Sequence, residues 1–169
     1  GLGAWLEQVG LANLADAVER WREGAGVEKL AEIQDRVADF AAALELGPAA
    51  RARVGLERIE GLRAWLDAAG LGAREADVYK WCENGGLADI AAVRSRTEDL
   101  ASALQLRPSA RAKLGLEKVA GLAEWLAAAD LADAAAEVDA WCEKVGVETV
   151  GEAEKKKADL ARSLALPPR

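Results

Sequence analysis

The sequence predicts an all-α protein made of three similar helical units in tandem. A phrase that begins with Trp-Leu recurs at intervals of 60 residues, as WLEQVGL at 5–11, WLDAAGL at 65–71 and WLAAADL at 125–131. Aligned without a gap, 25 of the 60 positions of the first copy are identical in the second. A period this regular marks one supersecondary unit repeated along the chain. We therefore predict units at residues 1–60, 61–120 and 121–169.

Apolar residues within a unit recur at helical spacing, and no run alternates apolar and polar residues as a strand would. Four short helices are predicted at the start of each unit. Their apolar residues in the first unit are Trp5, Leu6 and Val9; Leu14, Val18 and Trp21; Val27, Leu30 and Ile33; and Val37, Phe40, Ala41 and Leu44. Gly10, Gly26 and Gly47-Pro48 separate these segments, because glycine and proline end helices.

A fifth, long helix is predicted to close each unit and to become the first helix of the next. It would run from Pro48 to about Ala69, and again from Pro108 to about Ala129, because neither stretch holds a further proline or a polar loop. Each stretch contains two glycines, which cost about 1 kcal/mol apiece in a helix interior and favour a kink. Units that share such a helix would be held at a fixed angle.

The third unit is predicted to be truncated, since the sequence reaches Leu166-Pro167-Pro168-Arg169 where its fifth helix would start. A small helical unit that lacks one helix exposes apolar surface, and such surface usually binds a partner. The alternative is that the third unit closes without that helix.

Composition narrows the classes of function. The 169 residues are 51% hydrophobic and 30% charged, so the chain can bury a core and keep a polar surface. A net charge of −7 disfavours nucleic-acid binding, which depends on neutralising phosphates. No run approaches the ~20 apolar residues of a membrane helix, so no span is predicted. Peripheral association with a membrane complex stays open.

Nothing in the sequence predicts an enzyme, a cofactor or a metal site. Histidine, the commonest general base and metal ligand, is absent, and there is no phosphate-binding glycine loop. Cys82 and Cys142 follow tryptophans at equivalent positions and are predicted to be reduced, partly buried thiols rather than a disulfide. Methionine is also absent, which favours a chain cut from a longer precursor, for example after import into a chloroplast.

A set of motifs spans both full units and most of the third. In the second unit these are Trp65-Leu66, Gly70-Leu71, Val78, Trp81, Leu87, Ile90, TEDLASALQL at 97–106 and SARAKLGLEKV at 109–119. The pattern resembles the sterile alpha motif (SAM) domain, a five-helix module with a basic closing helix. It departs from that family at Leu104-Gln105-Leu106, where the family has a central glycine, and at Ser109-Ala110. The resemblance implies SAM-like units that bind proteins, including other SAM-like units, with a minority binding RNA.

In SAM domains an acidic middle surface typically meets the basic start of another domain's last helix. The resemblance implies partner-binding roles for the basic residues Arg51, Arg53, Arg107, Arg111 and Lys113, and for the acidic residues Asp35, Asp39, Glu98, Asp99 and Asp159. The three units carry net charges of −4, +1 and −4, which suits salt-sensitive association. The alternative is a solvated face, since exposed ion pairs contribute only about 0–1 kcal/mol each.

Six tryptophans recur in pairs, sixteen residues apart, and are predicted to be core residues: Trp5, Trp21, Trp65, Trp81, Trp125 and Trp141. A platform for a pigment or cofactor is the alternative.

Together these patterns predict a non-catalytic scaffold or linker that docks on or bridges subunits of a larger assembly. An organellar membrane complex, such as a photosystem with its antenna, is one example. A self-polymerising SAM scaffold and an RNA-binding SAM array are the alternatives.

Overall fold

The computed structural model describes residues 1–165, and its regular structure is entirely helical over that range. The predicted all-α class is therefore confirmed. Residues 166–169 lie outside the described residues, and with them Leu166, Pro167 and Pro168, on which the predicted truncation of the third unit depends.

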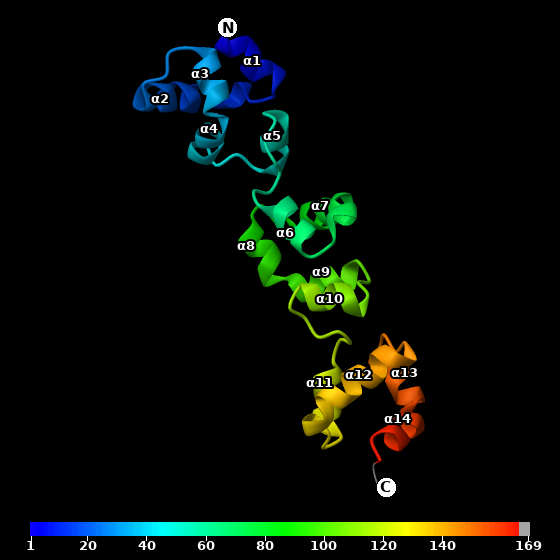
Figure 1. The fold of residues 1–169 in the computed structure, drawn as a ribbon. Coiled ribbons are helices and arrows are strands. Elements are labelled where there is room, and N and C mark those ends of the chain that lie inside the picture. The colour runs from blue at the N-terminus through cyan, green and yellow to red at the C-terminus, as the bar shows by residue number, and fades with distance from the viewer. Residues whose placement is uncertain (166–169) are drawn as a thin grey trace. The chain divides into compact units, whose positions relative to one another are not determined.

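The same series of helices occurs three times with an offset of 60 residues (Figure 1). A seven-residue helix opens each series: α1 Leu2–Gln8, α6 Leu62–Ala68 and α11 Leu122–Ala128. A 3₁₀ turn and an eleven-residue helix follow: η1 Ala12–Leu14 with α2 Ala15–Ala25, η2 Gly72–Arg74 with α7 Glu75–Gly85, and η3 Ala132–Ala134 with α12 Ala135–Val145. Two short helices come next: α3 Leu30–Asp35 with α4 Val37–Ala43, α8 Ile90–Ser95 with α9 Thr97–Ala103, and α13 Val150–Lys155 with α14 Lys157–Ser163. The first two series end with α5 Pro48–Arg53 and α10 Pro108–Lys113.

The chain forms two compact units, and neither coincides with a sequence repeat. One comprises Gly1–Arg63 with Cys82–Arg94, and the other comprises Ala64–Trp81 with the described chain from Ser95 onward. The three predicted boundaries stay predictions. Below, "repeat" denotes residues 1–60, 61–120 or 121–165, and each structural unit is described by itself.

The first unit contains a hydrophobic cluster built from every helix of the first repeat except α5. Its buried members are Leu6, Val9, Leu11, Val18, Val27, Ile33, Phe40, Ala41 and Leu46. Phe40 lies at its centre and contacts Trp5 and Trp21, with ring centroids 5.8 and 5.3 Å away. Ala50, and then Val54 beyond the end of α5, pack against this cluster from one side.

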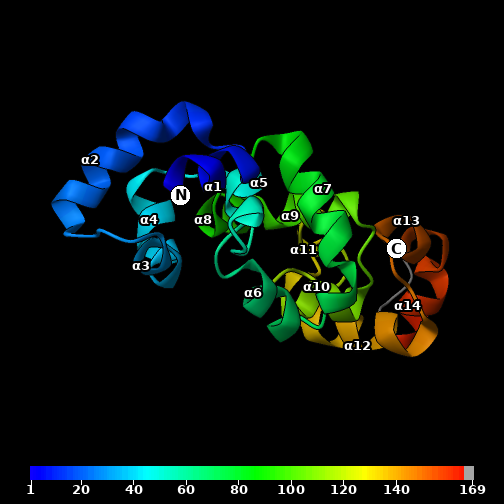
Figure 2. The same cartoon turned by 90° about the horizontal axis from the view of Figure 1, so that it is seen from above.

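The second unit contains an equivalent cluster in the third repeat. Its buried members are Val119, Leu122, Leu126, Val138, Trp141, Cys142, Val147, Ala153 and Leu160. Around it α13 and α14 lie side by side, and α14 also contacts α12 (Figure 2). Val119 precedes the predicted boundary at residue 120 and still belongs to this cluster.

The prediction of long helices shared between units is wrong. α5 ends at Arg53 and α10 at Lys113, and each is followed by a turn rather than a kinked helix. Gly55 and Gly115 adopt φ values of +85° and +76°, and Gly61 adopts +79°. A left-handed residue ends a right-handed helix, and two of them six residues apart leave no room for one between them.

Three residues other than glycine occupy the left-handed region just after α4, α9 and α14: Glu45, Gln105 and Ala165, with φ between +48° and +51°. A side chain there costs about 1 kcal/mol, so Gln105→Gly is expected to raise the free energy of unfolding by about that amount. Urea denaturation followed by circular dichroism would measure the change. Ser102→Gly, which puts glycine inside α9, should destabilise instead; a loss of stability in both variants would contradict the expectation.

Candidate functional site

The turn after α10 is held by Arg111, which the sequence placed among the partner-binding residues. Its guanidinium Nε donates to the carbonyl oxygen of Glu117 at 2.8 Å, and Nη2 lies 2.7 Å from the carboxylate of Glu98. Arg111 is only 5% exposed. Two residues predicted to bind partners from opposite sides are therefore bound to each other within one repeat.

In the first repeat, Arg51 holds the corresponding turn after α5. Its Nε donates to the carbonyl oxygen of Glu57 at 2.9 Å, while Nη2 makes a looser ion pair, at 3.5 Å, with exposed Glu60. Both arginines therefore serve the fold, and their predicted partner-binding roles stay predictions.

The side chain of Glu117, whose backbone carbonyl oxygen accepts the hydrogen bond from Arg111, holds the same turn at a second point. Glu117 accepts hydrogen bonds from the backbone N–H groups of Gly121 at 3.0 Å and Ala123 at 2.9 Å, at the start of α11. Glu57 binds the corresponding groups before and within α6. These bonds satisfy N–H groups that the first turn of a helix leaves free. Sequence reasoning missed this role, although Gly-Leu-Glu is identical in both copies.

Arg53 and Lys113 both lie against the end of the helix that opens their own repeat. Arg53 Nη1 donates to the carbonyl oxygens of Val9 at 3.4 Å and Gly10 at 3.1 Å. Lys113 Nζ lies 3.0 Å from where a Cβ on Gly70 would stand. Glycine at these positions leaves space for the cationic group.

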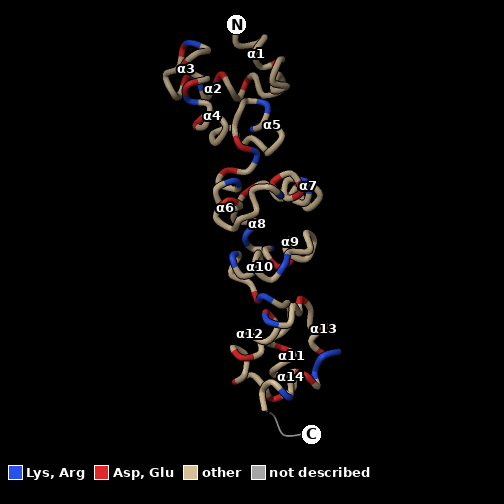
Figure 3. Tube along the Cα trace, turned by 45° about the vertical axis from the view of Figure 1, so that its right-hand side comes forward, with Lys and Arg blue, Asp and Glu red and all other residues tan. Residues whose placement is uncertain are grey.

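The remaining predicted charges lie on exposed helix surfaces, where acidic and basic positions are interspersed (Figure 3). Asp39, Asp99 and Asp159 each pair with an arginine three positions away along the chain: with Arg36 at 3.3 Å, with Arg96 at 3.1 Å and with Arg162. Asp35 and Arg107 are exposed as well. Exposed pairs of this kind contribute about 0–1 kcal/mol, so they orient side chains more than they stabilise the fold.

Trp5, Trp21 and Trp125 pack at the edges of the two clusters, whereas Trp141 is a buried member of the cluster in the third repeat. Trp141 is buried, and the other five are half-buried. Arg36 and Arg96 extend over the rings of Trp21 and Trp81, 5.9 and 5.5 Å from the centroids. Trp21 and Trp81 thus contribute apolar area on one side and a surface for a cation on the other.

Both cysteines are free and buried, in α7 and α12. Burial raises the pKa of the Cys82 thiol and of the Cys142 thiol above the ordinary value, so the reactive thiolate is disfavoured at neutral pH.

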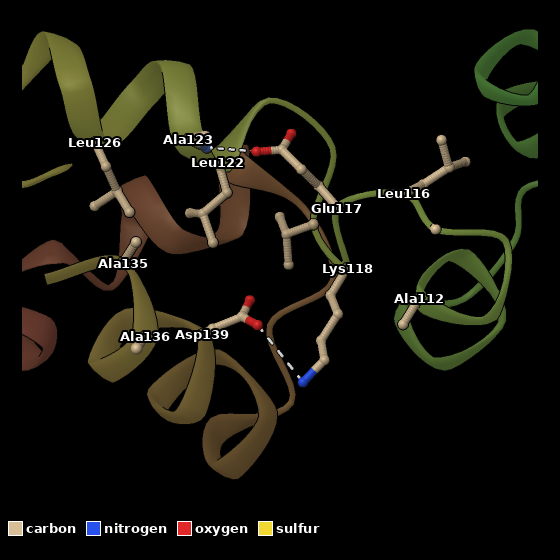
Figure 4. Close-up of a pocket in the computed structure, with 12 residues that line it drawn as sticks. Ala112, Leu116, Glu117, Lys118, Leu122, Ala123, Leu126, Ala135, Ala136 and Asp139 are labelled. Atoms are coloured by element: carbon tan, nitrogen blue, oxygen red, sulfur yellow. Dashed lines mark hydrogen bonds and ion pairs between the residues drawn. The ribbon is translucent and has the colours of Figure 1, made fainter. Parts of the chain in front are cut away.

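An open, largely apolar groove lies beside α11 in the second structural unit (Figure 4). It has a volume of about 510 Å³ and is lined from α10, the turn after it, α11 and the start of α12. Buried Val119, Leu122 and Leu126 form its apolar floor, and exposed Ala123, Ala135 and Ala136 form much of its wall.

Small residues keep this groove open. At the positions of Ala123 and Ala135 the preceding repeat has Arg63 and Glu75, and at the position of Asp139 it has Tyr79. The second repeat therefore has three large side chains where the third has two alanines and an aspartate, although both repeats form the same series of helices.

Lys118 stands at the edge of the groove and separates it from a second, more polar hollow of about 330 Å³. Its ammonium lies 3.3 Å from the carboxylate of Glu143 and 3.5 Å from that of Asp139. The hydrogen bond and charge of Glu143, followed by the charge of Asp139, raise the pKa of Lys118. Lys118 therefore stays charged, and Arg107 also lines the second hollow.

Comparison of the sequence with protein-family models and with curated proteins, and of the fold with solved structures, finds no match. Over residues 1–165, no three side chains of the kinds that bind metal ions come together as a site. No helix in that part of the chain has both the length and the hydropathy needed to cross a bilayer.

Proposed function

We propose that this chain is a non-catalytic protein–protein interaction scaffold, which docks on or bridges subunits of a larger assembly through the groove beside α11. The groove itself carries the proposal. It presents leucine and valine side chains in an open hollow whose wall is made of alanine, where an apolar side chain of a partner would displace water.

The chemistry of the groove favours a protein partner over a small substrate. Among the described residues that line it, the charged ones are Glu117, which caps α11, and Lys118 and Asp139, which pair with each other. These three charged groups are already bonded within the chain, whereas burying apolar area suits a protein interface, whose core is depleted of charge. The sequence resemblance to SAM domains, most of which bind proteins, supports the same function. The chloroplast and the photosystem–antenna assembly stay predictions.

The test fills the groove with the side chains that the second repeat carries at the same two positions. In the double variant Ala123→Arg and Ala135→Glu, both positions are exposed, so stability should change by no more than about 0.5 kcal/mol. We expect wild-type protein to capture specific partners from its native source and the variant to lose them. Equal capture by both proteins would contradict the groove proposal.

Two further measurements separate the alternatives. Concentration-dependent, salt-sensitive filaments in sedimentation of the purified chain would favour self-polymerisation. A shift of hairpin RNA in a native gel, lost on Arg107→Glu, would favour an RNA-binding array. The proposed scaffold predicts neither result.

A further inference from the structure

Acidic and basic residues are separated along the third repeat. Residues 121–143 hold six acidic residues and no lysine or arginine, whereas the equivalent parts of the first two repeats contain both signs. From the end of α12 through α14 the third repeat then gathers five basic residues (Figure 3): Lys144, Lys155, Lys156, Lys157 and Arg162. A strongly acidic part of the chain is thus followed by a local concentration of positive charge.

Four of these five cations have no basic counterpart in the other repeats. The equivalent residues of the first and second repeats are Gly24 and Asn84 for Lys144, Asp35 and Ser95 for Lys155, Val37 and Thr97 for Lys157, and Ala42 and Ser102 for Arg162. Lys156 alone aligns with arginines, and its ammonium lies 3.5 Å from the carbonyl oxygen of Val145, as Arg36 binds that of Ala25. Lys156 therefore serves the end of α12, and the other four are additions to a shared series of helices.

Two of the added cations, Lys144 and Arg162, line an open hollow of about 360 Å³ between α12 and α14. Trp141 and Val145 supply its apolar surface, and Asp159, which pairs with Arg162, lies in its lining as well. Val145 is a large apolar side chain that stays 38% exposed, where the first two repeats have alanine and glycine. The hollow therefore combines apolar surface with positive charge at its edge.

The side of the repeat that carries this hollow is open in all three repeats. The residues equivalent to Asp159, Arg162 and Ser163 are exposed in α4 and α9 as well: Asp39, Ala42 and Ala43, and Asp99, Ser102 and Ala103. In the first two repeats α5 and α10 follow these helices and leave the positions exposed. The third repeat therefore differs here in its side chains rather than in what covers them.

We propose that this hollow, with Lys155 and Lys157 beside it in sequence, is a second docking site, whose occupant is an acidic segment of a partner protein. Glutamate or aspartate side chains of that segment would meet the added cations, and one apolar side chain between them would cover Val145 and the edge of Trp141. The proposal rests on the scaffold function and specifies the chemistry of one of its partners.

A short acidic segment suits the charge of the repeat better than a nucleic acid or an anionic membrane does. A phosphate backbone or a bilayer surface extends well beyond a hollow of this size and would meet the acidic residues of 121–143, which repel it. A protein segment can confine its negative charge to the hollow.

The probe is a fluorescein-labelled peptide in which one leucine lies between two runs of glutamate, and anisotropy measures its binding to the full chain. We expect saturable binding that weakens as salt is raised. The double variant Lys144→Asn and Arg162→Ser, which carries the residues of the second repeat, should weaken binding about fivefold, because two exposed ion pairs are lost. Val145→Ala should weaken it about threefold, since less apolar area is buried.

Two controls separate these effects from a folding defect and from net charge. All the substituted positions are exposed, so circular dichroism should show the helical content of wild type in both variants. Lys80→Glu, at an exposed position of α7, changes the net charge by as much as the double variant does and should leave binding within about twofold of wild type.

Absence of saturable binding, or equal binding by wild type and the double variant, would overturn the proposal. Tighter binding of hairpin RNA or of phosphatidylserine vesicles, lost in the double variant, would assign the hollow to phosphate groups and overturn it. Self-association that the double variant abolishes would assign the hollow to a second copy, with the same consequence. The groove variant Ala123→Arg/Ala135→Glu should still bind the peptide. Loss of partner capture in that variant, together with no peptide binding by wild type, would leave the scaffold function standing and this second site refuted.

Discussion

Replacing Arg111 with methionine is expected to lower the free energy of unfolding by about 2–3 kcal/mol. Methionine keeps the apolar stem but removes a charge-assisted hydrogen bond to Glu98 and the donor to the Glu117 carbonyl, and such bonds contribute about 1.5–3 kcal/mol. The loss should stay below the 3–5 kcal/mol typical of a broken buried pair, because the Glu98 side chain is 55% exposed and regains water.

Urea denaturation would measure this loss, and two variants calibrate it. Arg107→Met, at an exposed position next to the start of α10, should cost less than about 0.5 kcal/mol. Arg51→Met should lower the free energy of unfolding less than Arg111→Met does. Arg51 makes the equivalent hydrogen bond to a carbonyl oxygen, but its ion pair, with Glu60, is looser. Equal stability of the Arg111 and Arg107 variants would show that Arg111 does not hold the turn.

Truncating Phe40 is expected to have the largest effect of any single substitution considered. Its side chain is fully buried between Trp5 and Trp21, so Phe40→Ala would leave a cavity that costs about 3–5 kcal/mol. Circular dichroism during urea denaturation gives the total loss. Hydrogen exchange of the amides of residues 1–60 shows whether the first repeat opens.

The second and third repeats supply the control, because they have leucine at this position, Leu100 and Leu160, and bury it. Phe40→Leu should therefore cost only about 1 kcal/mol after repacking. If Phe40→Ala were no more costly than Phe40→Leu, the assignment of Phe40 to the centre of the first cluster would be wrong.

The series of short helices was predictable because helical spacing and chain breakers agree. Val18 and Trp21 lie three residues apart within α2, and Gly26, with φ +64°, ends that helix as its position suggested. The turn after α5 was missed because Gly55 and Gly61 were weighed as kinks costing about 1 kcal/mol each. Both glycines instead adopt the left-handed conformation that ends the helix, and the Arg51 guanidinium holds the turn by donating to the backbone carbonyl oxygen of Glu57. Apolar periodicity gives no sign of either feature.

The candidate site was less predictable than the fold. Arginine is rarely buried, so a surface role for Arg111 was the reasonable expectation. Only its identity with Arg51 pointed to the turn. The groove was missed because small residues define it, and Ala123 and Ala135 are informative only beside Arg63 and Glu75 at the same positions of the preceding repeat.

The carboxylate of Glu117 determines where a recombinant fragment that contains the third repeat can begin. Val119 belongs to the third cluster, and Glu117 holds the first N–H groups of α11, so a recombinant piece that begins at Gly121 would lack part of its own interior and the anchor of its first helix. A piece that begins at Glu117 would keep both. A fragment meant to hold the cluster of the third repeat should therefore start no later than Glu117.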